Sequence, residues 1–149
     1  MIAAVQDPQD TVVTLHRIYL TPTGGKADVP TPKKFMPTPS TLKGAAVRLD
    51  TPGATLAVTE GVETGLAVRL SAGVPVWAGL SAVGMNNIVM PDTVRLVLIC
   101  ADNDPGGTGQ QASKKLARRM LAEGRRVKIL MPTTPGTDWA DGMGEAQHG

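Results

Sequence analysis

The sequence predicts an α/β fold, in which helices flank a roughly four-stranded, mainly parallel sheet and a small β-rich appendage precedes it. The chain has 149 residues, and 42% of them are hydrophobic, which is enough for one domain with a core. After residue 54, short apolar segments alternate with segments of helical spacing, and short loops separate them. Seven of the twelve prolines lie in residues 1–54, so a different architecture is expected there.

The first 54 residues are expected to form a β-rich, Pro-rich appendage, with residues 55–149 as the main domain. Pro30 to Pro39 punctuate one stretch, which excludes a helix and predicts an extended loop. β-Branched residues predict a first strand, and a Gly-Gly pair predicts the turn that follows it. The expected elements are strands at residues 11–20 and 45–49 and a turn at residues 23–26.

The remaining residues alternate between strands and helices. An apolar strand ends at Glu60-Gly61, and the helix that follows it ends at Gly73, because glycine is common just after a helix. Residues 94–101 form a continuous apolar run, as parallel strands buried on both faces do. Strands are expected at residues 55–59, 74–78, 94–101 and 126–131, and helices at residues 62–72, 81–88 and 108–123.

Composition argues against several classes of function. One cysteine, Cys100, excludes an internal disulfide and a Cys-rich zinc site and fits the reducing cytoplasm. No apolar run approaches the ~20 residues of a membrane span, and the N-terminus lacks the features of a signal peptide. The sequence has no P-loop, and His16 and His148 are not placed as a pair. Four aromatic residues argue against stacking platforms for single-stranded nucleic acid.

Acidic side chains follow three of the expected strands. Glu60 comes after the first, Asp102 and Asp104 after the third, and Asp138 and Asp141 after the fourth. Ligands of parallel sheets bind at the carboxyl ends of the strands, so these acids are expected at one edge. An all-oxygen set indicates Mg²⁺ or Mn²⁺ rather than zinc. Glu60 and Asp102 can share a site only if their strands are near neighbours.

Two segments of this pattern resemble the Toprim domain, the catalytic domain of bacterial primases, topoisomerases and some nucleases. They are Leu56-Ala57-Val58-Thr59-Glu60-Gly61 and Ile99-Cys100-Ala101-Asp102-Asn103-Asp104, and the resemblance covers about residues 55–142. The stretch from Glu60 to Ala67 and the ending Asp138-Trp139-Ala140-Asp141 are similar to primases and primase-helicases of phages and conjugative plasmids.

The resemblance implies roles for these acids. Asp102 and Asp104 would hold Mg²⁺, and Glu60 would act as general base or as another ligand. Asp138 resembles the last acid of the primase pattern, and Asp141 is a weaker match. Many bacterial primases carry an Asp four positions after the Glu, whereas this chain has Thr64 there and an acid, Glu63, one position earlier. Glu63 is therefore, like Asp141, a possible additional acid of the site.

Basic side chains offer candidate nucleic-acid or nucleotide contacts. Seven Lys and Arg residues lie between Lys114 and Lys128. They form either a solvated helix face or a track for a phosphate backbone. Three lysines flank the Pro-rich loop and could also meet a nucleic acid or a triphosphate. The candidates are Lys114, Lys115, Arg118 and Arg119 on the helix and Lys33, Lys34 and Lys43 near the loop.

The resemblance implies a cytoplasmic DNA primase domain that makes short RNA primers on single-stranded DNA. Its expected partners are template DNA, nucleoside triphosphates and a replicative helicase domain or protein. The chain has neither a Cys/His zinc module nor a helicase P-loop, so it is expected to be part of a longer primase. A Toprim-type metal-dependent nuclease and a non-catalytic nucleic-acid-binding domain are the alternatives. Topoisomerase activity is less favoured, because the only tyrosine, Tyr19, lies in a strand-like segment.

Overall fold

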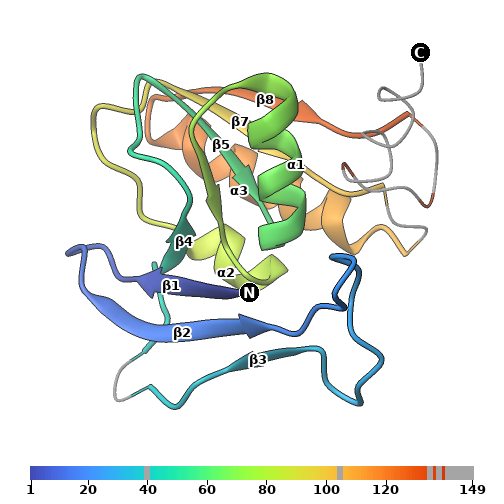
Figure 1. Ribbon diagram of the computed structural model, residues 1–149. Coiled ribbons are helices and arrows are strands. Elements are labelled where there is room, and N and C mark those ends of the chain that lie inside the picture. Colours follow the sequence, from blue (N-terminus) through green and yellow to red (C-terminus); the bar gives the residue numbers. More distant parts are fainter. Residues whose placement is uncertain (39–40, 104–105, 134–135, 137–138, 140–149) are drawn as a thin grey trace.

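A computed structural model describes residues 1–38, 41–103, 106–133, 136 and 139. Within them the chain forms one eight-stranded sheet with helices on both faces (Figure 1). The strands are β1 (Ile2–Gln6), β2 (Val12–Ile18), β3 (Lys33–Phe35), β4 (Ala46–Arg48), β5 (Thr55–Thr59), β6 (Val76–Ala78), β7 (Leu96–Cys100) and β8 (Arg126–Leu130). The helices are α1 (Val62–Ala72), α2 (Ala82–Asn87) and α3 (Thr108–Ala122).

The parallel part of the sheet has the strand order β6-β5-β7-β8, and all three pairings in it are parallel. Successive residues of β5 alternate between the two faces. Leu56 and Val58 pack with α2 and α3 side chains such as Met85 and Leu116, whereas Ala57 packs on the α1 side. The predicted α/β class, with a four-stranded parallel core between helices, is confirmed.

The N-terminal strands extend this sheet, which is therefore larger than predicted. β1, β2 and β3 form an antiparallel meander, and β4 joins β1 to β6 through two further antiparallel pairings. At the junction, the Arg48 guanidinium lies 4.3 Å from the centre of the Trp77 ring and binds the Asp10 carboxylate. No strand was predicted at β1, and only an extended loop was predicted at β3.

Local chemistry explains most of the observed element ends. Gly73 adopts a left-handed conformation (φ 62°) and donates its N–H to the Arg69 carbonyl, which closes α1 as predicted. The Ser81 hydroxyl oxygen accepts from Gly84 N and caps the start of α2. β6 begins after Pro75, because proline has no N–H to donate to a neighbouring strand.

The connection from β6 into α2 requires two glycines. A Cβ on Gly84 would overlap the carbonyl oxygen of Gly79, and a Cβ on Gly79 would overlap the Met85 backbone. The following residue, Leu80, has a positive φ of 70°, which is uncommon for a side chain of this kind. The connection is therefore a tight turn whose backbone lies directly against α2.

Candidate active site

The carboxyl edge of β5 and β7 is the candidate site. From β5 the chain crosses through α1 to β6 on one side, and it later returns through α2 to β7 on the other side. This reversal is a topological switch point, where open α/β sheets bind ligands. β5 and β7 are hydrogen-bonded neighbours with Thr59 opposite Cys100, so Glu60 and Asp102 follow adjacent strand ends. The condition for a shared site is met.

Thr64 connects α1 to the Asp102 carboxylate. Its hydroxyl donates to the two carboxylate oxygens at 3.3 and 3.4 Å, and the Thr64 side chain is buried. The bond orients Asp102 without adding negative charge to the edge. In the sequence Thr64 is only a departure from the primase pattern, and this contact was not predicted. Its position four residues after Glu60, one helical turn later, was the available signal.

Glu63 is engaged with the N-terminal strands. Lys33 Nζ on β3 lies 2.9 Å from the Glu63 carboxylate at the start of α1. Burial alone would raise the Glu63 pKa, whereas hydrogen bonds from Lys33 and from its own backbone N–H lower it. The charges of Lys33 and Lys26 lower the pKa further, so it is held below its usual value. Lys33 and Glu63 thus tie β3 to the helix that follows Glu60.

His16 on β2 lies beside this ion pair. Its ring stacks on Phe35 with the ring centres 4.8 Å apart, and its side chain is buried. Burial lowers the His16 pKa, the charge of Lys33 lowers it further, and the Glu63 carboxylate acts in the opposite direction. The lowered pKa favours the neutral form of His16, and its ring stacks on Phe35.

The His16 pKa predicts a pH-dependent stability. Since the folded pKa lies below the unfolded value of about 6.5, the unfolded chain binds a proton more readily. The native state should therefore lose stability as the pH falls below about 6.5, and His16→Gln should reduce that loss. Thermal unfolding at pH 7.5 and 5.5 measures both. His148→Gln is the matched control, and an equal loss in the His16 variant would contradict the prediction.

Three predicted acids, Asp104, Asp138 and Asp141, lie outside the described residues. Two described residues, Gly136 and Trp139, flank Asp138 in the sequence. Trp139 Nε1 donates to the carbonyl of Ala101 at 3.2 Å, and Gly136 N donates to the carbonyl of Asn103 at 2.7 Å. Gly136 and Trp139 therefore contact the residues on either side of Asp102.

The basic candidates lie in different settings. Lys114, Lys115 and Arg118 are exposed on α3, which begins at the carboxyl edge. Arg119 is used within the fold, where its guanidinium donates to the Ile88 carbonyl at 2.6 Å and pairs with Glu123. Lys34 is exposed on β3.

The donor set at the edge suits a hard divalent cation. Glu60 and Asp102 bring carboxylate oxygens from neighbouring strand ends, and Thr64 adds a hydroxyl beside one of them. Within the described part of the chain, no group of three His, Cys, Asp or Glu side chains is close enough to hold a metal.

Cys100 is buried at the end of β7, where burial raises the pKa of its thiol to about 12, helped by the Asp102 charge. None of the helices in the described ranges is long and apolar enough to cross a membrane.

Comparisons with known proteins agree with this geometry. A family model described as the Toprim domain matches residues 55–147, and one described as a domain of unknown function (DUF7146) matches residues 1–49. No curated protein matches the sequence.

Solved structures of primase cores share the fold. The chain is similar to a DNA primase domain from Pseudomonas aeruginosa, with a TM-score of 0.60 and 19% identity over 94% of this chain and 45% of that one. For the E. coli primase catalytic core the TM-score is 0.63, with 15% identity over 97% and 47%. For the DnaG catalytic core it is 0.66, with 15% identity over 98% and 48%. The chain thus spans just under half the length of these chains.

Proposed function

Because this chain belongs to the Toprim family, we propose that it is the Toprim-containing part of a DNA primase and takes part in making RNA primers on single-stranded DNA. The observation that carries the proposal is the pairing of β5 with β7, which places Glu60 and Asp102 at adjacent strand ends. The likeness to primase cores extends over both the N-terminal strands and the parallel part, since it covers 94–98% of the chain.

In this proposal the acids of the carboxyl edge hold Mg²⁺ or Mn²⁺. Asp102 and Asp104 are its ligands, with Glu60 and Asp138 as further ones and Asp141 as an additional acid. Bound there, the metal neutralises phosphate charge during nucleotidyl transfer. Thr64 supports this role, because its hydroxyl restricts the Asp102 carboxylate to one orientation.

Glu60 is proposed to accept the proton of the attacking hydroxyl. Its backbone is fixed from both sides, because β5 ends directly before it and its carbonyl accepts from Leu80 N at 2.7 Å. Lys33 and Lys34 on β3 are the proposed nucleotide contacts. The exposed Lys114, Lys115 and Arg118 are the proposed contacts to a phosphate backbone. Arg119 is proposed to belong to the same basic helix, although its guanidinium is bound to Ile88 and Glu123.

The wider context is part of the proposal. We infer that residues 1–54 form an N-terminal β-rich unit and residues 55–149 the Toprim unit. We also infer that the protein works in the cytoplasm, where nucleoside triphosphates are available. A replicative helicase domain or protein is its proposed partner. The resemblance of the Glu60–Ala67 stretch to phage and plasmid primases supports an origin in such an element.

Asp102→Asn tests the metal site and the reaction together. Calorimetric titration with Mg²⁺ and Mn²⁺ should show saturable binding to the wild type. In the variant the affinity should fall by at least about 10–100-fold, the loss that is usual when a partner of a metal ligand is changed. Without metal, the variant should stay folded, because an amide still accepts from Thr64. Asp92→Asn, at an exposed carboxylate, is the matched control.

Incubation with nucleoside triphosphates and single-stranded DNA then separates the alternatives. Primer synthesis by the wild type that Asp102→Asn abolishes supports a primase. Metal-dependent cleavage of the DNA without synthesis would identify a nuclease. Metal-independent DNA binding with neither reaction would identify a non-catalytic domain.

A further inference from the structure

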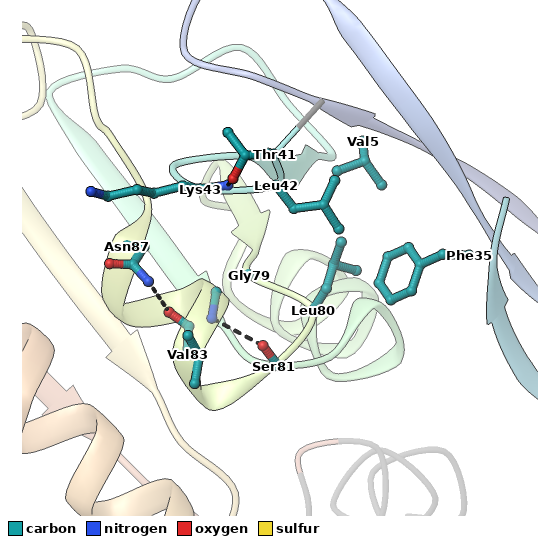
Figure 2. A pocket seen from close by; sticks show the side chains of 12 residues that line it. Val5, Phe35, Thr41, Leu42, Lys43, Gly79, Leu80, Ser81, Val83 and Asn87 are labelled. Carbon is teal, nitrogen blue, oxygen red and sulfur yellow. Dashed lines mark hydrogen bonds between the residues drawn. The ribbon is translucent and has the colours of Figure 1, made fainter. Parts of the chain in front are cut away.

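A cavity of about 430 Å³ is lined by residues of the N-terminal strands and of the turn into α2 (Figure 2). It lies beside the candidate active site, because one of its lining residues, Leu80, donates its N–H to the Glu60 carbonyl. One wall comes from the N-terminal strands and the loop before β4, with Phe35 and Leu42 among its residues. The opposite wall is the tight turn from β6 into α2, with Leu80 and Val83. Its volume falls in the range of about 300–1,000 Å³ that is usual for small-ligand sites.

The apolar part of the cavity is preorganised. The Phe35 and Leu80 side chains lie next to each other in Figure 2, and Leu42 lies beside Leu80. Phe35 keeps 43% of its surface exposed, although its stack on His16 holds the ring in place. Val83 on the α2 wall is 71% exposed. These side chains offer flat and aliphatic surface to a planar apolar group.

Two polar side chains that line the cavity keep hydrogen-bonding capacity, and of the two Asn87 lies at the end opposite Phe35 (Figure 2). Ser81 Oγ accepts from Gly84 N, which leaves the hydroxyl hydrogen to donate. Asn87 Nδ2 donates to the Val83 carbonyl, which leaves the amide oxygen to accept. The cavity thus combines a donor and an acceptor with an aromatic ring, and Lys43 among its lining residues adds a positive charge.

The cavity is connected to the carboxyl edge through both walls. On one wall, Leu80 N donates to the carbonyl of Glu60, the proposed proton acceptor. On the other, Phe35 and Lys33 are two residues apart on β3 and so project to the same face of the strand. A group held against Phe35 therefore lies two residues along β3 from Lys33, which pairs with Glu63 at the start of α1.

We propose that this cavity binds the nucleobase of a nucleotide, with the ring against Phe35 and the polar edge of the base toward Ser81. The phosphates then extend along β3 toward Lys33 and the carboxyl edge. The proposal rests on the proposed function, because it takes the ligand of the edge to be a nucleotide. The base belongs either to a free nucleoside triphosphate or to the template strand.

Binding measured in a Glu60→Gln background, where turnover is blocked, tests the proposal. Calorimetry with ATP, GTP, CTP and UTP, each with Mg²⁺, and fluorescence anisotropy with a labelled oligodeoxynucleotide cover the two sources of the base. Phe35→Ala should weaken binding of one of them by roughly tenfold, the loss typical of a deleted stacking contact. Val83→Trp, which fills the cavity from an exposed helix position, should do the same without removing Phe35.

Leu121→Ala is the control, because it truncates an apolar side chain on the distant α3 surface, where Leu121 is 59% exposed. Loss of triphosphate affinity in both cavity variants assigns the site to the incoming nucleotide, and loss of oligonucleotide affinity alone assigns it to the template. Affinities equal to those of Leu121→Ala overturn the proposal, as does the absence of any nucleotide or DNA binding. Primer synthesis by the wild type is measured separately. Synthesis without any effect of the cavity variants overturns the nucleobase site alone, whereas the absence of synthesis counts against the proposed primase function.

Discussion

Glu60→Gln is expected to reduce primer synthesis by about 1,000-fold while leaving nucleic-acid binding intact. General-base catalysis contributes roughly 10²–10⁴ to a rate, and an amide of the same shape cannot take up the proton. The fold should tolerate the change, because the hydrogen bond from Leu80 N to the Glu60 carbonyl is made by two backbone groups and does not involve the Glu60 side chain. Extension of a labelled primer measures synthesis, and anisotropy with single-stranded DNA measures binding.

A matched variant shows whether the effect belongs to this position. Glu123→Gln makes the same chemical change at the end of α3, where the carboxylate pairs with Arg119 and Arg125. It should retain the wild-type rate of synthesis. Retained synthesis in Glu60→Gln together with lost DNA binding would refute the proposed role and make Glu60 a binding residue.

Gly84→Ala is expected to destabilise the fold by about 3 kcal/mol, the upper part of the usual range for overpacking. The new Cβ would overlap the Gly79 carbonyl oxygen, which is backbone and cannot rotate away. Relief requires α2 to move from the β6 turn. Met85, which is buried in the core shared with α3, would have to move with it.

Urea unfolding followed by circular dichroism measures this loss. Gly53→Ala is the control, because a Cβ there would meet only the Thr55 carbonyl at 4.0 Å, an ordinary contact. Equal midpoints for the two variants would show that the turn and α2 separate at little cost.

The parallel part of the fold could be predicted from the sequence, because the patterns that mark its strands and helices are local. Apolar runs mark β5 and β7, the four-residue spacing of Ala112, Leu116 and Met120 marks α3, and Gly73 ends α1. The rule that ligands bind at the carboxyl ends of parallel strands then directs attention to Glu60 and Asp102. Their adjacency depends on the strand order, which periodicity does not reveal.

The features that were not predicted depend on contacts between distant residues. β1 is recognisable as a strand only through its pairing with β2 and β4, and β4 joins the parallel sheet through β6. Likewise, the ion pair of Glu63 could not be predicted, because its partner Lys33 comes from a strand that the Pro-rich sequence disguises. The Thr64–Asp102 bond joins residues 38 positions apart.

Cys100 gives the protein an internal reporter of opening at the candidate active site. It is the only cysteine, it ends β7 two residues before Asp102, and it is buried with a thiol pKa of about 12. Because only an accessible thiolate reacts with alkylating reagents, closed molecules are protected. The rate of alkylation therefore reports the fraction of molecules in which the end of β7 has separated from its neighbours. A ligand that stabilises this edge will slow the labelling of Cys100 whether or not any chemistry follows.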